Sequence, residues 1–342
     1  MAPMTGLAER LAPPASVPYP GVHLGLRWRS IIASDAPRVY ELIRTVEAAD
    51  DSHHRTSADE VANMVEGKRG IEWVDALVGI DSEHRICAVA TVKVLRSLTE
   101  QANAVVNAYI HPHWRGRGLG RALLYWQDGR ARQMLVETFG ADSEIPVSIH
   151  NFVDAHMTDR RRLYIAAGFY AKRTFQIMYR ELEGSEKAPS PRGGYTVIPW
   201  AQVPLEEVRE VHMDAFLDHY RSSLRGMWWE EAIGNLDPRW SFVALSPEGE
   251  PVGYCMTGRP VERWVSTGRT EAYVELLGVA AEHRGHGLST ALLGASVAAA
   301  SASGISRIGL DVDTASPSNA HSIYEHLGFV DGPAEVFYTI DQ

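Results

Sequence analysis

Arg115-Gly116-Arg117-Gly118-Leu119-Gly120 lies in the first half of the chain, and Arg284-Gly285-His286-Gly287-Leu288-Ser289 repeats its pattern in the second half. Each copy follows an apolar run typical of a strand, at 104–110 and 273–279, and precedes an apolar helical pattern. A glycine-rich turn between a strand and a helix exposes backbone N–H groups, and the helix N-terminus adds partial positive charge. Both loops are therefore suited to bind phosphate, with the two arginines as further donors.

The spacing of these loops differs from two common phosphate motifs. A Walker loop needs Gly-Lys-Ser/Thr, and a dinucleotide fingerprint needs Gly-x-Gly-x-x-Gly early in its fold. A second element, Tyr-x-x-x-Gly-Phe, follows each loop, at Tyr164–Phe169 and at Tyr324–Phe329. The arginines that open the loops lie 169 residues apart and the tyrosines 160 residues apart. This spacing indicates two copies of one domain rather than a solenoid.

With both elements duplicated, the chain resembles the GCN5-related N-acetyltransferase (GNAT) family in its tandem form, over nearly all of the chain beyond the first ~25 residues. The resemblance implies an α/β (α+β) fold with tandem GNAT domains, each a mixed, mostly antiparallel sheet flanked by helices. In that fold the fourth and fifth strands part, and the pantetheine arm of acetyl-CoA enters the gap. Acetyl-CoA is therefore the expected cofactor, as the acetyl-donor substrate.

Segments rich in proline, glycine and serine predict the domain boundaries. Residues 1–23 hold five prolines and are expected to form a poorly ordered arm. The N-terminal domain is expected at 24–182, a linker at 183–194 and the C-terminal domain at 195–342. The order of strand and helix patterns is the same in the two repeats.

Composition fits two domains in a reducing compartment. The chain has 342 residues, of which 45% are hydrophobic, enough for two cores. Only Cys87 and Cys255 are present, one per repeat, which argues against a disulfide framework and favours the cytoplasm. We expect no secretory signal and no membrane span, because the longest small-apolar stretch, 291–302, is too short to cross a bilayer.

The acidic excess lies in the second half of the chain. Residues 1–185 hold 22 Lys and Arg and 22 Asp and Glu, whereas residues 186–342 hold 11 and 21. Either this charge is a solvated, solubilising surface or it attracts a cationic amine to the second domain. Without a basic patch, nucleic acid is not expected as the main partner. No Cys/His spacing suggests a metal site, and a homodimer is left open.

The family resemblance also implies which residues bind the donor. A backbone N–H just past a bulged fourth strand is expected to polarise the thioester carbonyl, near Gly278–Val279 and, in the first repeat, Tyr109–Ile110. An asparagine on the later helix, Asn319, is expected to bond the pantetheine arm, with helix capping as an alternative. Asp159 occupies its place in the first repeat and cannot donate when ionised. The full expected set is Leu277, Gly278, Val279, Arg284, Gly285, His286, Gly287, Leu288, Ser289 and Asn319, with Ile110, Arg115, Gly116, Arg117, Gly118, Leu119 and Gly120 in the first repeat.

Two residues of the second repeat are candidates for proton transfer. Glu275 lies on the expected fourth strand, where the family often places a carboxylate, and a buried Glu destabilises a fold unless it is paired or functional. Tyr324 lies where family members often have a tyrosine that reaches the coenzyme sulfur. The alternatives are an exterior-facing carboxylate and a core tyrosine. Val106, the counterpart of Glu275, cannot take a proton.

Acceptor specificity is expected from the first two helices of the second repeat and their connection. Aromatic and acidic side chains together suit a cationic amine, although the two tryptophans are equally consistent with core anchors. The residues in question are His212, Asp214, Asp218, His219, Tyr220, Trp228, Trp229, Glu230 and Glu231.

The sequence therefore predicts a cytoplasmic, acetyl-CoA-dependent N-acetyltransferase that acts on the primary amine of a small, cationic molecule. Its catalytic groups are expected in the C-terminal domain. One alternative is mycothiol synthase-like acetylation of a cysteinyl pseudodisaccharide. Others are a non-catalytic acetyl-CoA sensor or scaffold, and an enzyme that acetylates proteins.

Overall fold

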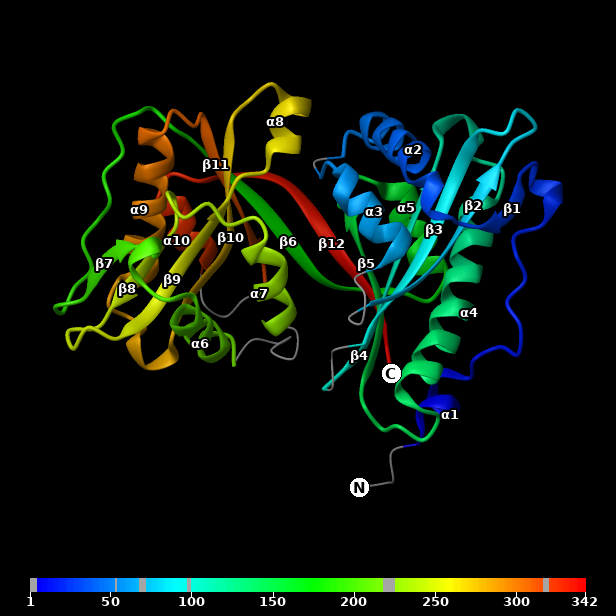
Figure 1. The fold of residues 1–342 in the computed structure, drawn as a ribbon, viewed down its shortest axis with the longest axis horizontal. Helices are drawn as coiled ribbons and strands as arrows, with labels where there is room; N and C mark the ends of the chain where they lie inside the picture. Colours follow the sequence, from blue (N-terminus) through cyan, green and yellow to red (C-terminus); the bar gives the residue numbers. More distant parts are fainter. Residues whose placement is uncertain (1–4, 53, 68–71, 97–99, 218–224, 316–319) are drawn as a thin grey trace. The chain divides into compact units, whose positions relative to one another are not determined.

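The protein is described by a computed structural model covering residues 5–52, 54–67, 72–96, 100–217, 225–315 and 320–342 (Figure 1). It divides into two compact units. The first comprises residues 1–174 together with 334–342, and the second comprises residues 175–333. Each unit holds a mixed sheet with helices on both faces, so the expected fold class is confirmed.

In the first unit, strands are ordered β1-β2-β3-β4-β5-β12. Neighbouring strands are antiparallel, except that β4 and β5 are parallel. Alternating apolar residues supply two buried clusters, one on each face of this sheet. The strands are β1 (Arg27–Ser30), β2 (Glu72–Ile80), β3 (Ile86–Leu95), β4 (Ala102–Ile110), β5 (Val147–Asp154) and β12 (Val330–Asp341).

The helices of the first unit cover both faces of its sheet (Figure 1). The long α4 (Leu119–Phe139) packs against one face of β3 and β4, and α2 (Ala36–Ala49) against the other. Helix α3 (Ala58–Glu66) begins with a capping box, in which the Ser57 hydroxyl accepts the Glu60 amide at 3.1 Å and the Glu60 carboxylate accepts the Ser57 amide at 2.7 Å. Helix α5 (Thr158–Ala166) follows β5.

The N-terminal segment differs from the expected poorly ordered arm. Residues 7–11 form a short helix, α1 (Leu7–Leu11), whose two leucines are fully buried in the cluster beneath α4. Arg10 donates to the carbonyl oxygens of Ile145 (2.7 Å) and Ser143 (3.2 Å). Two leucines spaced one helical turn apart therefore anchor a segment whose prolines suggested disorder.

In the second unit, strands are ordered β6-β11-β10-β9-β8-β7, and the described neighbours are antiparallel except β10 and β11. The strands are β6 (Tyr170–Glu181), β7 (Thr196–Pro199), β8 (Phe242–Leu245), β9 (Pro251–Gly258), β10 (Glu271–Val279) and β11 (Arg307–Asp313). Residues 183–194, the expected linker, form no helix or strand.

Helices of the second unit also cover two faces. Residues of α9 (Leu288–Ala302) and α10 (Ala320–His326) share one buried cluster with the sheet, and residues of α6 (Leu205–Ala215) and α7 (Arg225–Ile233) share another. A short helix that the sequence analysis did not anticipate, α8 (Val261–Thr267), connects β9 to β10. Among the described residues, no helix combines the length and apolarity needed to cross a membrane.

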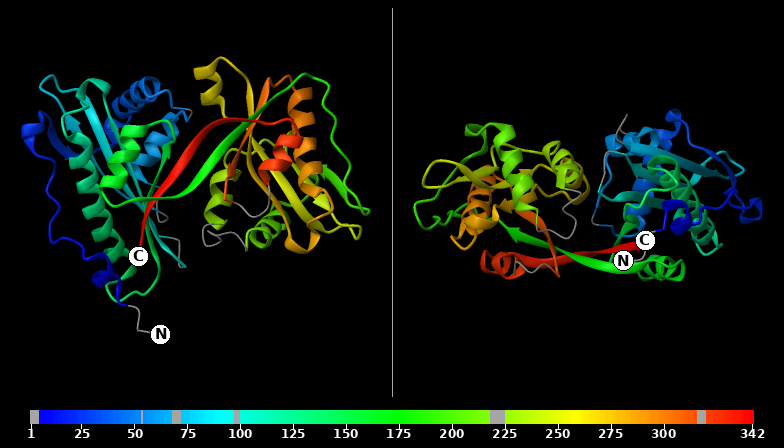
Figure 2. Two further views of the ribbon diagram at one scale, coloured as in Figure 1. Left: turned by 180° about the vertical axis from the view of Figure 1, so that it is seen from behind. Right: turned by 90° about the horizontal axis from the view of Figure 1, so that it is seen from below.

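The compact units do not coincide with the sequence repeats, because each repeat's last strand belongs to the other repeat's sheet. β12, from the second repeat, pairs with β5 from Glu335↔Asp154 to Asp341↔Ser148 (Figure 2). β6, from the first repeat, pairs with β11 from Asp313↔Phe175 to Arg307↔Glu181. The units divide near 174 and 333, and the boundaries at 182 and 195 stay predictions for the sequence repeats.

Candidate functional site

The two parallel strands of the second unit are paired over only part of their lengths. β10 and β11 are in register from Glu271↔Arg307 to Val274↔Leu310, and both then continue without pairing to each other. In the first unit, β4 and β5 likewise pair only from Ala102↔Val147 to Val105↔His150. This parting of the fourth and fifth strands is the arrangement that the family resemblance implies for both repeats.

A β-bulge distinguishes the two repeats at the point where the strands part. The pairing of β10 with β9 shifts register between Val274 and Leu276, so Glu275 is the extra residue of the bulge. β4 pairs with β3 without any shift, and Val106, the counterpart of Glu275, is fully buried. The expectation of a bulged fourth strand is therefore wrong for the first repeat. There β4 and β3 pair regularly, with the apolar Val106 at the position of Glu275.

The Glu275 side chain is half-buried where glycine leaves space for it. A Cβ atom at Gly258 would lie 2.5 Å from Glu275 Oε1 and 3.0 Å from the Asn235 carbonyl oxygen. Burial raises the pKa of Glu275 to about 7, and the Asp311 carboxylate adds to this rise. A hydrogen bond from the Asn235 side chain and the charge of Arg263 oppose it. A carboxylate that titrates near neutrality suits a general base.

Tyr324 lies on α10, with its ring packed against the core beneath α9. Burial raises the pKa of Tyr324 well above its ordinary value, and nearby Cys255 adds to this rise. Within the described part of the chain, its hydroxyl makes no hydrogen bond. By contrast, Tyr164 of the first unit is buried, and Asn151 Nδ2 donates to its hydroxyl at 2.7 Å. Of the two tyrosines, Tyr324 alone has a hydroxyl not already engaged by a described residue.

The second glycine-rich loop presents open backbone to its surroundings. Gly285 (φ 85°) and Gly287 (φ 76°) have left-handed conformations that favour glycine, and no atom lies within 4 Å of a Cβ built on either. α9 begins at Leu288 without a side-chain cap, which leaves its first N–H groups available to an anion. Arg284 donates to the carbonyl oxygens of Val279 (3.1 Å) and Ala215 (2.9 Å), which joins the loop to β10 and α6.

Several expected donor-site residues have side chains buried in the core of the second unit. The Leu288 and Val279 side chains are buried, and Leu277 packs against the cluster beneath α9. The His286 ring contacts the Tyr195 ring at a tilt of 39°, with 4.9 Å between ring centroids. The remaining expected residues are Gly278, whose added Cβ would lie 2.9 Å from the Tyr254 ring, Ser289, which is half-buried in the first turn of α9, and Asn319, which lies outside the described residues.

The first loop has the same backbone but different neighbours. Gly116 and Gly118 also have positive φ, and α4 begins directly after them at Leu119. Arg115, however, forms a two-pronged ion pair with Asp50 at 2.5 and 3.0 Å. The Arg117 guanidinium lies over the Trp114 ring, 4.4 Å from its centroid. The cation expected to meet phosphate is thus paired with a carboxylate of the same unit.

Other groups of the first unit connect the end of α2 with the end of β5. His156 Nε2 donates to the Asp50 carbonyl oxygen at 2.8 Å, and the Ser52 hydroxyl donates to Asp154 at 3.0 Å. Tyr109 replaces Gly278, and burial raises the pKa of its phenol to about 12. Asp159, expected as the poorer counterpart of Asn319, is exposed on α5 and lies 3.8 Å from Arg162. The first unit therefore has neither a carboxylate at the position of Glu275 nor a glycine at the position of Gly278.

The aromatic residues near the acceptor side of the second unit are mainly core. Trp229 is buried. His212 Nε2 donates to the Arg225 carbonyl oxygen at 2.7 Å, and Nδ1 of the neutral ring accepts from the Tyr254 hydroxyl at 2.5 Å. The core interpretation is therefore confirmed for Trp229. Asp214 and Glu230 are exposed, whereas residues 218–220 and the Glu231 side chain lie outside the described parts.

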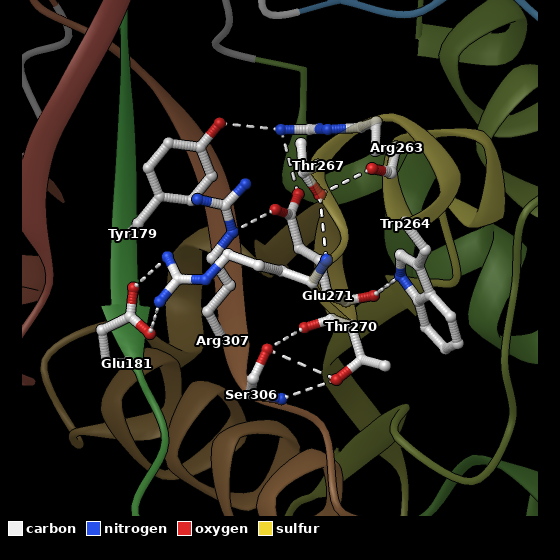
Figure 3. A network of polar contacts seen from close by, with 10 residues as sticks. Tyr179, Glu181, Arg263, Trp264, Thr267, Thr270, Glu271, Ser306 and Arg307 are labelled. Carbon is white, nitrogen blue, oxygen red and sulfur yellow. Dashed lines mark hydrogen bonds and ion pairs between the residues drawn. The ribbon is translucent and has the colours of Figure 1, made fainter.

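A buried ion-pair network fixes the strand starts just before the strands part (Figure 3). Glu271 on β10 accepts from Arg307 Nε on β11 at 2.5 Å and pairs with Arg263 of α8 at 2.9 Å. Arg263 also donates to the Tyr179 hydroxyl of β6 at 2.7 Å. The sequence analysis missed this network because α8, which supplies Arg263, was not expected.

Comparison with known proteins agrees with this geometry. Residues 205–329 match the Acetyltransferase (GNAT) family. A GCN5-related N-acetyltransferase from Sphaerobacter thermophilus is 26% identical, the match covering 92% of this chain and 95% of that chain with a TM-score of 0.67. The second repeat of this chain therefore matches the GNAT family, and the whole chain is similar to a solved GNAT acetyltransferase. Members of the family take their acetyl group from acetyl-CoA, and the open loop, the uncapped α9 and the parted strands of the second unit fit that donor.

Two further solved structures share the fold of this chain. A tandem GNAT protein from the clavulanic acid biosynthesis pathway is 16% identical, covers 92% of this chain and 98% of its own, and has a TM-score of 0.65. A GCN5-related glucosamine N-acetyltransferase region of a fungal multi-domain GH3 β-N-acetylglucosaminidase is 11% identical, covers 92% of this chain and 38% of its own, and has a TM-score of 0.65. A search of curated proteins finds no match.

Proposed function

We propose that the second unit acetylates the primary amine of a small, cationic molecule in the cytoplasm, with Glu275 as general base and Tyr324 as general acid. The observation that carries the proposal is the position of Glu275, in the bulge where β10 leaves β11. Its pKa, raised to about 7, supports this role, since such a carboxylate takes a proton readily near neutrality.

The bound donor supplies its acetyl group as a thioester. In the proposed reaction, Glu275 takes a proton from the ammonium of the acceptor, and the freed nitrogen lone pair forms a C–N bond to the acetyl carbonyl carbon. The C–S bond breaks with its electron pair on sulfur, and the Tyr324 hydroxyl gives its proton to that sulfur. The proton then lost by the nitrogen restores the tyrosine, so each turnover releases one proton overall, from Glu275.

Binding of the donor and of the acceptor is assigned to different features of the second unit. The Arg284–Ser289 loop and the start of α9 hold the pyrophosphate, and the backbone near Gly278–Val279 polarises the thioester carbonyl. The acidic excess of residues 186–342 supports a cationic acceptor, such as an amino sugar, an amino acid derivative, or an amine-bearing antibiotic or its precursor. The first unit has a structural role in this proposal.

The test compares coenzyme A release from acetyl-CoA across a panel of amines for the wild type, Tyr324→Phe and Tyr164→Phe. We expect Tyr324→Phe to lower kcat by about 10²-fold with the best amine, because a positioned acid contributes roughly that much. Tyr164→Phe removes the matching hydroxyl in the first unit and should keep wild-type kcat. Equal activity of the wild type and Tyr324→Phe would remove Tyr324 from the mechanism.

A wild-type protein that binds acetyl-CoA but releases no coenzyme A with any amine of the panel would contradict the proposal and favour a sensor. Binding is followed by calorimetry, so this result is distinguished from a protein that does not take the donor at all. Thermal unfolding of each variant shows whether a lost activity reflects chemistry or a lost fold.

A further inference from the structure

One face of the second unit's sheet carries the polar side chains near Glu275. Ile308, Leu310 and Val312 of β11 belong to the cluster beneath α9. Because strand side chains alternate, Gly309 and Asp311 lie on the opposite face. On β10, Ala272 and Val274 also belong to that cluster, which places Tyr273 on the same face as Asp311. The Glu275 carboxylate lies on this face too, because it lies against Gly258, the partner of Tyr273 in the pairing of β10 with β9.

The register of the strands brings Asp311 beside Glu275. Tyr273 and Gly309 are directly paired in the parallel ladder. Two residues further along each strand are Glu275 and Asp311, so the two carboxylates occupy the next position on one face. Neighbouring strands lie about 4.8 Å apart, and β10 and β11 part from this point on. The effect of Asp311 on Glu275 is consistent with this proximity.

The neighbours of Asp311 hold it in place and leave it exposed. The side chain is exposed on β11, and the Tyr273 hydroxyl forms a hydrogen bond with it. The Tyr179 and Tyr273 rings close over Gly309, where a Cβ would lie 2.9 and 3.0 Å from them. Arg263 of α8, whose charge interacts with Asp311, also pairs with Glu271 and donates to the Tyr179 hydroxyl. Asp311 is therefore an exposed carboxylate on the same face of the sheet as the proposed base, Glu275.

We propose that Asp311 is a specificity-determining residue, which binds the ammonium group of the acceptor beside Glu275 and selects against amines that carry a carboxylate on the adjacent carbon. The inference rests on the proposed function, since it assigns the acceptor side of the same site. The favoured substrate class is a primary amine on an uncharged carbon, such as an amino sugar or an alkylamine, rather than the amino group of an α-amino acid.

The selection follows from charge. An ammonium between two carboxylates is paired with Asp311 while Glu275 takes its proton, and the charged hydrogen bond to Asp311 strengthens binding. An α-carboxylate lies two bonds from the same nitrogen and would be brought against Asp311, where like charges repel. Exclusion of a competitor by repulsion thus accompanies attraction of the correct substrate.

The experiment measures steady-state kinetics of the full chain and Asp311→Asn with two matched pairs, 3-methylbutylamine with leucine and 2-phenylethylamine with phenylalanine. We expect the variant to raise KM for the amines by about tenfold, the loss typical of one charge-assisted hydrogen bond. Its preference for each amine over the matching amino acid should fall by a similar factor. Glu248→Gln, in the exposed turn between β8 and β9, removes one negative charge elsewhere in the unit and should leave both values unchanged.

A pH profile separates an electrostatic role from a merely structural one. The groups that face Glu275 are Asp311 on β11, Arg263 on α8, Asn235 after α7 and Tyr273 on its own strand. Of these, Asp311 favours the protonated form of Glu275. Removing its charge should therefore move the acidic limb of kcat/KM to lower pH, whereas a variant that only loosened the fold would not shift that limb.

Calorimetric titration of the same amines distinguishes failure of this inference from failure of the proposed function. Turnover by the wild type with unchanged KM, selectivity and pH profile in Asp311→Asn would overturn the role of Asp311 alone. No turnover by the wild type would overturn the proposed function. In that event, weaker amine binding by Asp311→Asn would still support Asp311 as the ammonium site, and unchanged or absent amine binding would overturn it.

Discussion

Burial in the folded protein disfavours the ionised form of Glu275. This effect can be measured from the free energy of unfolding, separately from catalysis. Folding raises its pKa from the ordinary range to about 7, so the folded state binds a proton more tightly than the unfolded chain. The stability associated with this proton is fully present at pH 4, falls as pH rises through the window up to about 7, and stays lost above it. The same residue must lose its proton to act as a base, so activity and stability change in opposite directions with pH.

Replacing Glu275 by glutamine separates these two effects. We expect Glu275→Gln to lower kcat/KM at pH 8 by about 10²–10³-fold, in the range of a lost general base. The variant should also be more stable than the wild type at pH 8, by about 3 kcal/mol at most, and equally stable near pH 4. Chemical denaturation at both pH values and coenzyme A release test this. If the difference in the free energy of unfolding between the variant and the wild type were the same at pH 8 as at pH 4, the raised pKa of Glu275 would be contradicted.

At the scale of elements, the two glycine-rich loops form a matched pair. Gly285 and Gly116 have similar φ, 85° and 75°, and no atom lies within 4 Å of a Cβ at either. Alanine at either position should therefore lower the free energy of unfolding by a similar amount, about 1–2 kcal/mol, from backbone strain alone. We expect only Gly285→Ala to raise KM for acetyl-CoA, because turnover is assigned to the second unit. Thermal unfolding and kinetics of both variants check this, and a matching KM change in Gly116→Ala would move donor binding for turnover to the first loop.

Three elements, β10, α8 and β11, show how much of the fold could be predicted from the sequence. The strand expected at 273–279 is found as β10, Glu271–Val279, because an apolar run ahead of a glycine loop leaves little choice. α8 was missed, since its seven residues include two β-branched valines and no side-chain cap, both weak signals for a helix. Asp311 was not singled out either. Its position beside Glu275 depends on strand register, which neither strand's own sequence determines.

At the scale of the whole molecule, the exchange of the last strands determines which segments of the chain contain all the strands of one sheet. Residues 175–333 form one continuous unit, whereas a fragment cut at the repeat boundary, 195–342, lacks the β6 strand that covers β11. An uncovered strand edge leaves unpaired backbone groups and destabilises a sheet. The repeats could be recognised from motif spacing, but similarity between them cannot tell which sheet receives each last strand.

The two fragments give a direct test. We expect 175–333 to unfold cooperatively on heating and to retain coenzyme A release, because it keeps Glu275, the Arg284 loop and Tyr324. The fragment 195–342, of similar length, should lack a cooperative transition and activity. Circular dichroism and the amine assay report both. Equal behaviour of the two fragments would mean that β6 contributes little to the second sheet.

The strand exchange also has a consequence for synthesis on the ribosome. The sheet of the first unit is completed by residues 334–342, which leave the exit tunnel only after the whole second unit. Most of the second unit is therefore synthesised before the first unit can complete its sheet, although it follows the first repeat in the gene. During translation the newly made first repeat has to wait with the edge of β5 uncovered, so it is the part of this enzyme on which we expect chaperones to act.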